Sequence, residues 1–422
     1  MRRLAWSIVV VATLVSWSTA VAAEAPLDTA KPESVGMSTE RLNRIAPAMQ
    51  RYIDEGLVAG TVTLVARRGQ IVHLEARGYR NVDSKAPMTT DTIFRQVPMT
   101  KPIASVALVI LLEEGKVGLQ DPVAKYLPEF EDVQVSTTGD ASGNTGSLES
   151  PKGPMTIRQL LSHTAGLANS YLGNSTFVRE YPRKPPPTDT LEKLVKRVAE
   201  LPLNYHPGTE WQYSLATDVV ARLVEVISGM SLDAFLRQRI FEPLDMMDTS
   251  HFLDRSKAGR LASLCRAGGA GRIVLADPGS TESPLVSGPK TRFRGATGLL
   301  STANDYLRFQ QMMLNGGDLE GVQLLGRKAV ELMFANHTGD MPVWVFPYGT
   351  GFGLGYAVVL DRGAAATPQT EGAVFWGGAF GTWFWIDRQE ELIGVLMYQV
   401  APNNYLSIRD DSVTLVFQAI VD

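Results

Sequence analysis

Strand-like patterns stand near both ends of this chain, while helical patterns fill its middle. Residues 61–67 and 71–76 flank a turn at 68–70, which predicts a β-hairpin. Further apolar or alternating stretches occupy 352–360, 381–386 and 392–399. A short link at 388–390 joins the last two. We therefore expect an α/β (α+β) fold in which one antiparallel sheet is built from both chain ends and flanked by helices.

Apolar residues recur at helical spacing in several stretches. Ser38 is a candidate N-cap for a helix over 39–55, and Thr302 begins one that ends near Gly316. Another helix is expected to begin near Pro98, with one buried face. The remaining predicted helices cover 190–201, 215–228, 232–241 and 412–420.

Three stretches show neither the helical nor the strand periodicity of apolar residues and are predicted to be loops. Residues 134–155 are rich in Ser, Thr, Gly and Asp, and 170–189 are irregular and rich in Pro. Residues 254–296 are rich in Gly, Ser and Pro, and we expect them to border the ligand site. A cleft between the sheet and the helical middle is the natural place for that site.

Charge and composition exclude several classes of protein. Lys plus Arg total 40 and Asp plus Glu total 44 among 422 residues, so nothing indicates nucleic acid as a partner. The five histidines are scattered and Cys265 is the only cysteine, so we expect no metal site, no cofactor and no internal disulfide. The length allows one large domain or two that share a site.

Residues 1–23 have the pattern of a signal peptide. Arg2 and Arg3 precede an apolar run over 4–17, and small residues at 20–23 suit cleavage. A retained anchor is the alternative, but the run is short for a span of about 20 residues. We expect an exported protein, periplasmic or secreted, with no stable membrane anchor.

Three separate segments carry the chemistry of the chain. The first is Phe94-Arg95-Gln96-Val97-Pro98-Met99-Thr100-Lys101, the second is Trp211-Gln212-Tyr213-Ser214, and the third is Trp376-Gly377-Gly378-Ala379. In order and spacing they resemble the S-x-x-K, Y-S-x and W-x-G motifs of class C β-lactamase-related serine hydrolases, closest to the family VIII carboxylesterases. Flanking segments at 160–167, 241–246 and 298–302 agree with this resemblance.

The resemblance covers nearly all of the chain from about residue 36. It implies a β-lactamase and penicillin-binding-protein-like domain over 24–422. The sheet part is expected from about 36–95 and 297–422, and the mainly helical part from about 96–296.

The resemblance also implies roles for individual residues. Lys101 corresponds to the motif lysine and Tyr213 to the tyrosine that relays a proton to the leaving group. Ser214 is expected to line the pocket, and the wall Trp376-Gly377-Gly378 is followed by Ala379 as the expected oxyanion donor. The position of the nucleophilic serine is occupied by Pro98.

Proline at position 98 removes two functions at once. It has no hydroxyl, so no acyl-enzyme can form there, and it has no N–H to hold an oxyanion. Helix geometry places Thr100 on the wrong side. Ser105 is expected on the correct face but about 10 Å further along the helix axis, which is too deep to replace the serine. Ser214 is the remaining candidate hydroxyl, resting on proximity alone.

Lys101 and Tyr213 would be left as a proton-transferring pair in which each lowers the pKa of the other. The alternative is that both are structural. Trp376 replaces the lysine that would recognise a β-lactam carboxylate, which disfavours antibiotic hydrolysis. Together with Phe380 and Trp383 it indicates a small, apolar or aromatic ligand.

Three functions therefore stay open. The chain is a hydrolase-like enzyme that acts on a small ester, amide or lactone, or that uses Lys101 and Tyr213 for other acid–base chemistry. It is an exported ligand-binding pseudoenzyme with the pocket retained. Or it is an ordinary esterase altered at Pro98, since serine and proline codons can differ by one base.

Overall fold

The computed structural model describes residues 27–136, 147–167, 189–269, 272–404 and 406–422. The predicted signal segment, 1–23, and nearly all of the predicted irregular stretch 170–189 lie outside the described residues. Within the described ranges, every helix is too short or too polar to span a bilayer.

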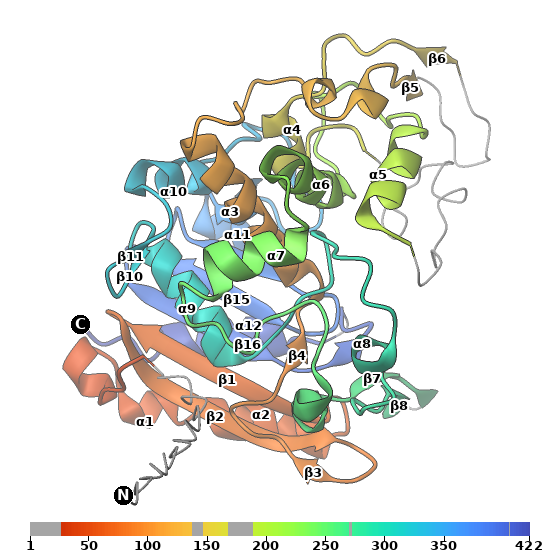
Figure 1. Ribbon diagram of the computed structural model, residues 1–422. Coiled ribbons are helices and arrows are strands. Elements are labelled where there is room, and N and C mark those ends of the chain that lie inside the picture. Colours follow the sequence, from red (N-terminus) through yellow and green to blue (C-terminus); the bar gives the residue numbers. More distant parts are fainter. Residues whose placement is uncertain (1–26, 137–146, 168–188, 270–271, 405) are drawn as a thin grey trace, which may run out of the picture.

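An antiparallel sheet of eight strands contains segments from both ends of the chain (Figure 1). Strand β1 (Gly60–Arg67) pairs with β2 (Gln70–Asn81) on one side and with β16 (Leu392–Met397) on the other. The other strands are β3 (Ala86–Pro87), β12 (Thr350–Phe352), β13 (Ala357–Val359), β14 (Val374–Gly377) and β15 (Trp383–Asp387). Their order, β12-β13-β14-β15-β16-β1-β2-β3, confirms the predicted sheet.

Helices cover the two faces of this sheet (Figure 1). Strand β1 is buried at all eight of its positions, so the sheet needs cover on both sides. Helices α2 (Ile45–Asp54) and α12 (Ile408–Phe417) pack on each other and reach β2 and β16. Helix α9 (Ala303–Leu314), capped by Thr302 as predicted, lies against β1, β15 and β16.

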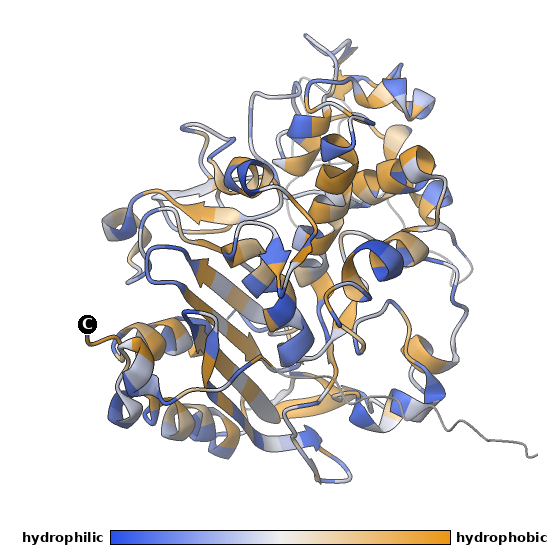
Figure 2. Cartoon of the chain, turned by 60° about the vertical axis from the view of Figure 1, so that its left-hand side comes forward, coloured by the Kyte–Doolittle hydropathy of each residue, from blue (hydrophilic) through white to orange (hydrophobic). Residues whose placement is uncertain are grey.

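A mainly helical region packs beside the sheet. Its centre is α3 (Thr100–Glu113), which contacts α6 (Ala216–Ser228). The single buried face predicted for α3 is too narrow, because every residue from 100 to 111 is buried. Figure 2 shows apolar residues running through these central helices. The other helices of the region are α4 (Ile157–Leu161), α5 (Leu191–Ala199) and α7 (Leu232–Leu236).

The stretch 254–296 is more ordered than the predicted long loop. It contains β7 (Leu264–Ala267), β8 (Ile273–Asp277) and α8 (Pro284–Ser287). Strands β7 and β8 join β17 (Val400–Ala401) in a separate sheet, where Cys265 N–H donates to the Gln399 carbonyl at 3.0 Å. This partner lies far along the chain, so local periodicity gave no sign of the pairing.

Several predicted boundaries were also wrong. The expected strand 352–360 turns at Gly355, whose φ of 94° allows the chain to reverse between β12 and β13. The expected first helix is interrupted after α1 (Thr39–Leu42), and α12 begins four residues before the expected 412. One pair of short strands, β5 (Val135–Ser136) with β6 (Leu148–Glu149), lies within the predicted loop 134–155.

Glycine is required at the centre of β16. Gly394 lies opposite Trp385, and a Cβ at position 394 would overlap the indole ring of that buried tryptophan. We expect Gly394→Ala to lower the free energy of unfolding by about 1–3 kcal/mol, the usual cost of overpacking. Urea denaturation measures this change in the free energy of unfolding. Gly153→Ala is the matched control, because a Cβ there meets nothing within 4 Å; equal stability of both variants would contradict the expectation.

Candidate active site

A strained turn leads into the helix that carries the first segment. Strand β4 (Phe94–Arg95) is followed by a 3₁₀ turn over Val97–Met99 and then by α3. Val97 has a φ of 49°, a conformation that a β-branched residue before proline adopts at a cost of about 1–3 kcal/mol. Two bonds hold the turn: Gln96 N–H donates to the Leu299 carbonyl at 2.8 Å, and the Thr382 hydroxyl donates to the Gln96 carbonyl at 3.2 Å.

This turn places Pro98 in the wall of a cavity, with Lys101 one helical turn further on. The pyrrolidine ring fits the first 3₁₀ turn, where its missing N–H leaves no helical bond broken. Lys101 is only 2% exposed, and its Nζ donates to Thr217 Oγ1 at 3.4 Å. The position expected to hold a nucleophile therefore presents only carbon to the cavity.

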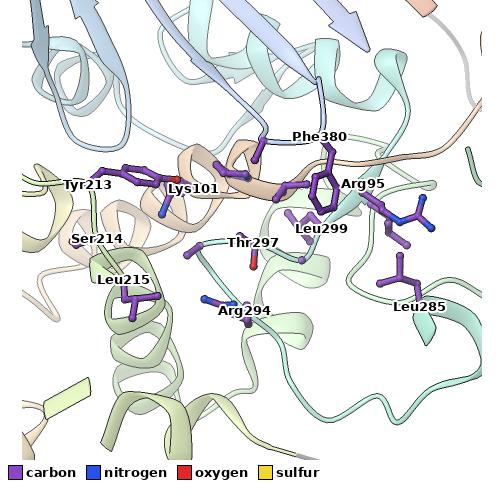
Figure 3. A pocket seen from close by; sticks show the side chains of 16 residues that line it. Arg95, Lys101, Tyr213, Ser214, Leu215, Leu285, Arg294, Thr297, Leu299 and Phe380 are labelled. Atoms are coloured by element: carbon purple, nitrogen blue, oxygen red, sulfur yellow. The ribbon is translucent and has the colours of Figure 1, made fainter. Parts of the chain in front are cut away.

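Lys101 and Tyr213 meet in the cavity as the sequence predicts (Figure 3). Lys101 Nζ lies 4.6 Å from the centroid of the Tyr213 ring. Burial lowers the pKa of Lys101 to about 7, while burial raises the pKa of Tyr213 above that of a free phenol. The prediction that each lowers the pKa of the other was wrong, because desolvation and not their mutual contact is the largest cause of both shifts.

An ion pair joins a buried carboxylate to an arginine of the cavity wall. Asp218, on α6, is fully buried and is held by the guanidinium of Arg294. Arg294 Nε lies 3.2 Å from Asp218 Oδ2, and Ala296 N–H donates to the other carboxylate oxygen at 3.0 Å. Sequence reasoning missed both residues. Asp218 stands five positions after Tyr213, which is one usable signal, whereas Arg294 fell in a stretch expected to be irregular.

The cavity has a volume of about 530 Å³, within the range of small-molecule sites. Carbon dominates its surface, and its polar groups are few. It contains the predicted residues Pro98, Lys101, Tyr213, Ser214 and Ala379. The other lining residues are Arg95, Val97, Leu215, Leu285, Arg294, Ala296, Thr297, Gly298, Leu299, Leu300 and Phe380.

The third segment contributes Ala379 and Phe380 to the lining, and three predicted wall residues lie behind it. Trp376 is buried and its ring lies 5.6 Å from that of Tyr213, so it supports the tyrosine. Gly377 and Gly378 continue the strand end, where Gly378 N–H donates to the Thr382 carbonyl at 2.7 Å. The lining thus starts one residue beyond the predicted wall.

Ala379 is the predicted oxyanion donor. Its N–H has no hydrogen-bond acceptor among the described residues, although its carbonyl accepts from Asn403 at 3.1 Å. The opposite donor would be the N–H of residue 98, which proline lacks. The predicted oxyanion site would therefore have one backbone donor, at Ala379, in place of the two that the resemblance implies.

Ser214 is tied into a network with a buried histidine. His163 Nδ1 lies 3.1 Å from Ser214 Oγ and accepts from Ser214 N–H at 3.3 Å. Ala216 N–H also donates to Ser214 Oγ at 3.3 Å. Burial lowers the pKa of His163 well below its usual value, so its imidazole is neutral. Sequence reasoning noted the segment 160–167 but gave His163 no role; its ring lies 5.2 Å from that of Tyr213.

The two other hydroxyls weighed as substitutes lie outside the cavity lining. Thr100 Oγ1 accepts from Leu299 N–H at 3.2 Å and holds the neighbouring loop. Ser105 is 1% exposed and packs beneath the turn at Gly355. Neither hydroxyl faces the space in front of Lys101.

An antiparallel sheet beside a helical region, with a lysine and a tyrosine meeting at their junction, defines a protein of the β-lactamase and penicillin-binding-protein class. The beta-lactamase family profile matches residues 45–416, and the chain belongs to that family. The predicted resemblance and fold are therefore confirmed.

Two curated relatives cover most of the chain. Protein Rv1367c of Mycobacterium tuberculosis (strain ATCC 25618 / H37Rv) is 32% identical over 371 residues, which span 84% of this chain and 89% of the relative. Esterase EstB of Burkholderia gladioli is 29% identical over 377 residues, 85% of this chain and 90% of the esterase. Among solved structures, EstCE1, described as a hydrolase with promiscuous acyltransferase activity, has a TM-score of 0.75 at 27% identity and covers 90% of this chain and 99% of its own.

Proposed function

We propose that this protein binds a small apolar ester, amide or lactone and hydrolyses it by proton transfer through Lys101 and Tyr213, without a serine acyl-enzyme. The observation that carries the proposal is the cavity wall itself. It combines a buried amine, a phenol and the ring of Pro98 within one apolar space. The family supplies ester and acyl chemistry as the class of reaction, and the relatives named esterase support it.

The two side chains suit opposite steps of a direct attack by water. Neutral Lys101 is the general base, because burial brings its pKa to about 7 and leaves a large share of the amine uncharged near neutral pH. Tyr213 is the proton donor to the leaving oxygen, because burial keeps its phenol protonated. The N–H of Ala379 would hold the developing oxyanion. Ammonium Lys101 then gives a proton to the phenolate oxygen of Tyr213, so that both groups return to their starting states.

The ligand is proposed to be apolar or aromatic because of what surrounds the pair. Carbon supplies most of the cavity surface, and the lining includes Leu215, Leu285, Leu299 and Phe380. Burial of such surface contributes about 25 cal/mol per Å² on binding. The N-terminal pattern at residues 1–23 supports an exported location for this activity.

Removing either proton-transferring group should reduce turnover of the native protein. We expect Lys101→Met and Tyr213→Phe each to lower kcat/KM for p-nitrophenyl butyrate and the aromatic lactone dihydrocoumarin by about 100-fold or more. The base must be neutral to act, so the rate of the native protein should rise as pH increases through about 7. Initial rates between pH 5.5 and 8.5, corrected for spontaneous hydrolysis, measure both effects.

Matched variants at exposed positions show whether a loss of activity is specific to Lys101 and Tyr213. Lys328 has a side chain that is 79% exposed and Tyr348 is 83% exposed, so Lys328→Met and Tyr348→Phe should keep the native rate. Unchanged turnover in the Lys101 and Tyr213 variants would end the acid–base proposal. Saturable binding of these compounds without any turnover would instead favour a pseudoenzyme, in which Pro98 leaves a receptor with a hydrolase pocket.

A further inference from the structure

The amine of Lys101 stands in the cavity without a carboxylate partner. Among the described residues, no Asp or Glu oxygen lies within 4.0 Å of its Nζ, whose recorded neighbours are Thr217 Oγ1 and the Tyr213 ring. The nearby Asp218 carboxylate is already engaged by Arg294 and by Ala296 N–H. An amine free of a salt bridge needs to break no ion pair before its lone pair reacts.

The other polar groups of the lining are poor competitors for an electrophile. Ser214 Oγ is hydrogen-bonded to His163 and Ala216, and the guanidinium of Arg294 is held by Asp218. Pro98 contributes no hydroxyl one helical turn away. Lys101 Nζ is consequently the most nucleophilic atom that the described lining presents to a ligand.

We infer that Lys101 forms an imine with small apolar aldehydes or ketones that enter this cavity, a reaction beyond the hydrolysis proposed above. The lone pair of Nζ attacks the carbonyl carbon, the C–O π electrons move to the oxygen, and that oxygen becomes a hydroxyl by taking one proton from the nitrogen. Loss of that hydroxyl as water, with the proton given by the Tyr213 phenol, forms the C=N bond. Tyr213 recovers its proton from nitrogen, so amine plus carbonyl gives imine plus one water.

The surroundings favour this condensation in three ways. The cavity of about 530 Å³ accepts a small aliphatic or aromatic aldehyde beside the amine. Its mostly apolar lining suits the hydrocarbon part of such an aldehyde or ketone, whose burial contributes about 25 cal/mol per Å². Burial also lowers the pKa of Lys101 to about 7, so the free amine is abundant near neutral pH, where exposed lysines are almost wholly protonated.

Reductive trapping tests the inference on the full chain. The native protein is treated at pH 7 with benzaldehyde and sodium cyanoborohydride, and then analysed by intact mass and peptide mapping. We expect one N-benzyl group per chain, on the Lys101 peptide, formed about 10-fold or more faster than on any exposed lysine, because far more of Lys101 is unprotonated. Lys101→Met should lose this adduct and Lys328→Met should keep it.

Peptide mapping of the native chain keeps the test valid even if Lys101→Met folds poorly. Benzyl groups spread over exposed lysines with none on Lys101 would overturn the inference, as would unchanged labelling in folded Lys101→Met. The two proposals fail separately. An adduct without Lys101-dependent ester hydrolysis supports the imine and rejects the proposed function, and hydrolysis without an adduct does the reverse.

Discussion

Pro98→Ser is expected to turn the protein into an efficient esterase. The substitution places a hydroxyl one helical turn before Lys101 and restores a backbone N–H opposite that of Ala379. One oxyanion donor alone is worth about 100- to 1000-fold in rate, and the nucleophile adds the acyl-enzyme route. We expect hydrolysis of p-nitrophenyl butyrate to rise about 1000-fold or more, with a burst of p-nitrophenol in pre-steady-state measurements.

Pro98→Ala separates the two functions that proline removes. Alanine restores the N–H without a hydroxyl, so this variant can gain oxyanion stabilisation and cannot form an acyl-protein at residue 98. The excess of the serine variant over the alanine variant therefore measures the hydroxyl. Equal activity in the two variants, or a burst already present in the native protein, would contradict the role given to Pro98.

Arg294→Met is expected to cause the largest loss of stability among the variants discussed. Asp218 is fully buried, and Arg294 with Ala296 N–H satisfies its carboxylate. Removal of one partner of a buried ion pair leaves an uncompensated charge and typically costs about 3–5 kcal/mol. Urea denaturation at pH 7, followed by tryptophan fluorescence, measures the change in the free energy of unfolding.

Two controls show whether the buried charge is the cause. Arg44→Met removes an exposed partner of Glu40 and should change the free energy of unfolding by no more than about 0.5 kcal/mol. Replacing both members, as Asp218→Leu with Arg294→Met, removes the orphaned carboxylate and should recover part of the lost stability. A double variant less stable than Arg294→Met would argue against an electrostatic origin.

Local sequence patterns were sufficient to predict the large sheet and most of the helices. The turn at residues 68–70 and the link at 388–390 mark two hairpins, and β1 and β16 then meet because each buries both of its faces. The Thr302 cap placed the start of α9 within one residue. These features depend on neighbours in sequence, which is why periodicity and capping residues reveal them.

Features that depend on distant partners were missed. Strand β7 pairs with its neighbour β8 and also with β17 near residue 400, and nothing inside 254–296 specifies the contact with β17. Arg294 reaches Asp218 across 76 positions of sequence, so a loop arginine gave no hint of a buried pair. Trp376 has the motif position expected of a wall residue, yet it lies outside the cavity lining and its ring packs against that of Tyr213.

The site also has features that the sequence predicts and features that it does not. The motif spacing brought Lys101 and Tyr213 together correctly, because both positions are fixed by the family fold. Their protonation could not be read from sequence, since it follows from how completely each is desolvated. His163, whose ring lies 5.2 Å from that of Tyr213, is a similar case, because burial is the largest cause of its lowered pKa.

Intact-mass analysis after treatment with a fluorophosphonate tests most directly whether the head of α3 has lost its nucleophile. We predict no adduct on the native chain and one phosphonyl group, located at residue 98, on Pro98→Ser. A phosphonyl adduct on another side chain of the native protein, gained in step with loss of its ester turnover, would mean that a different nucleophile has taken over.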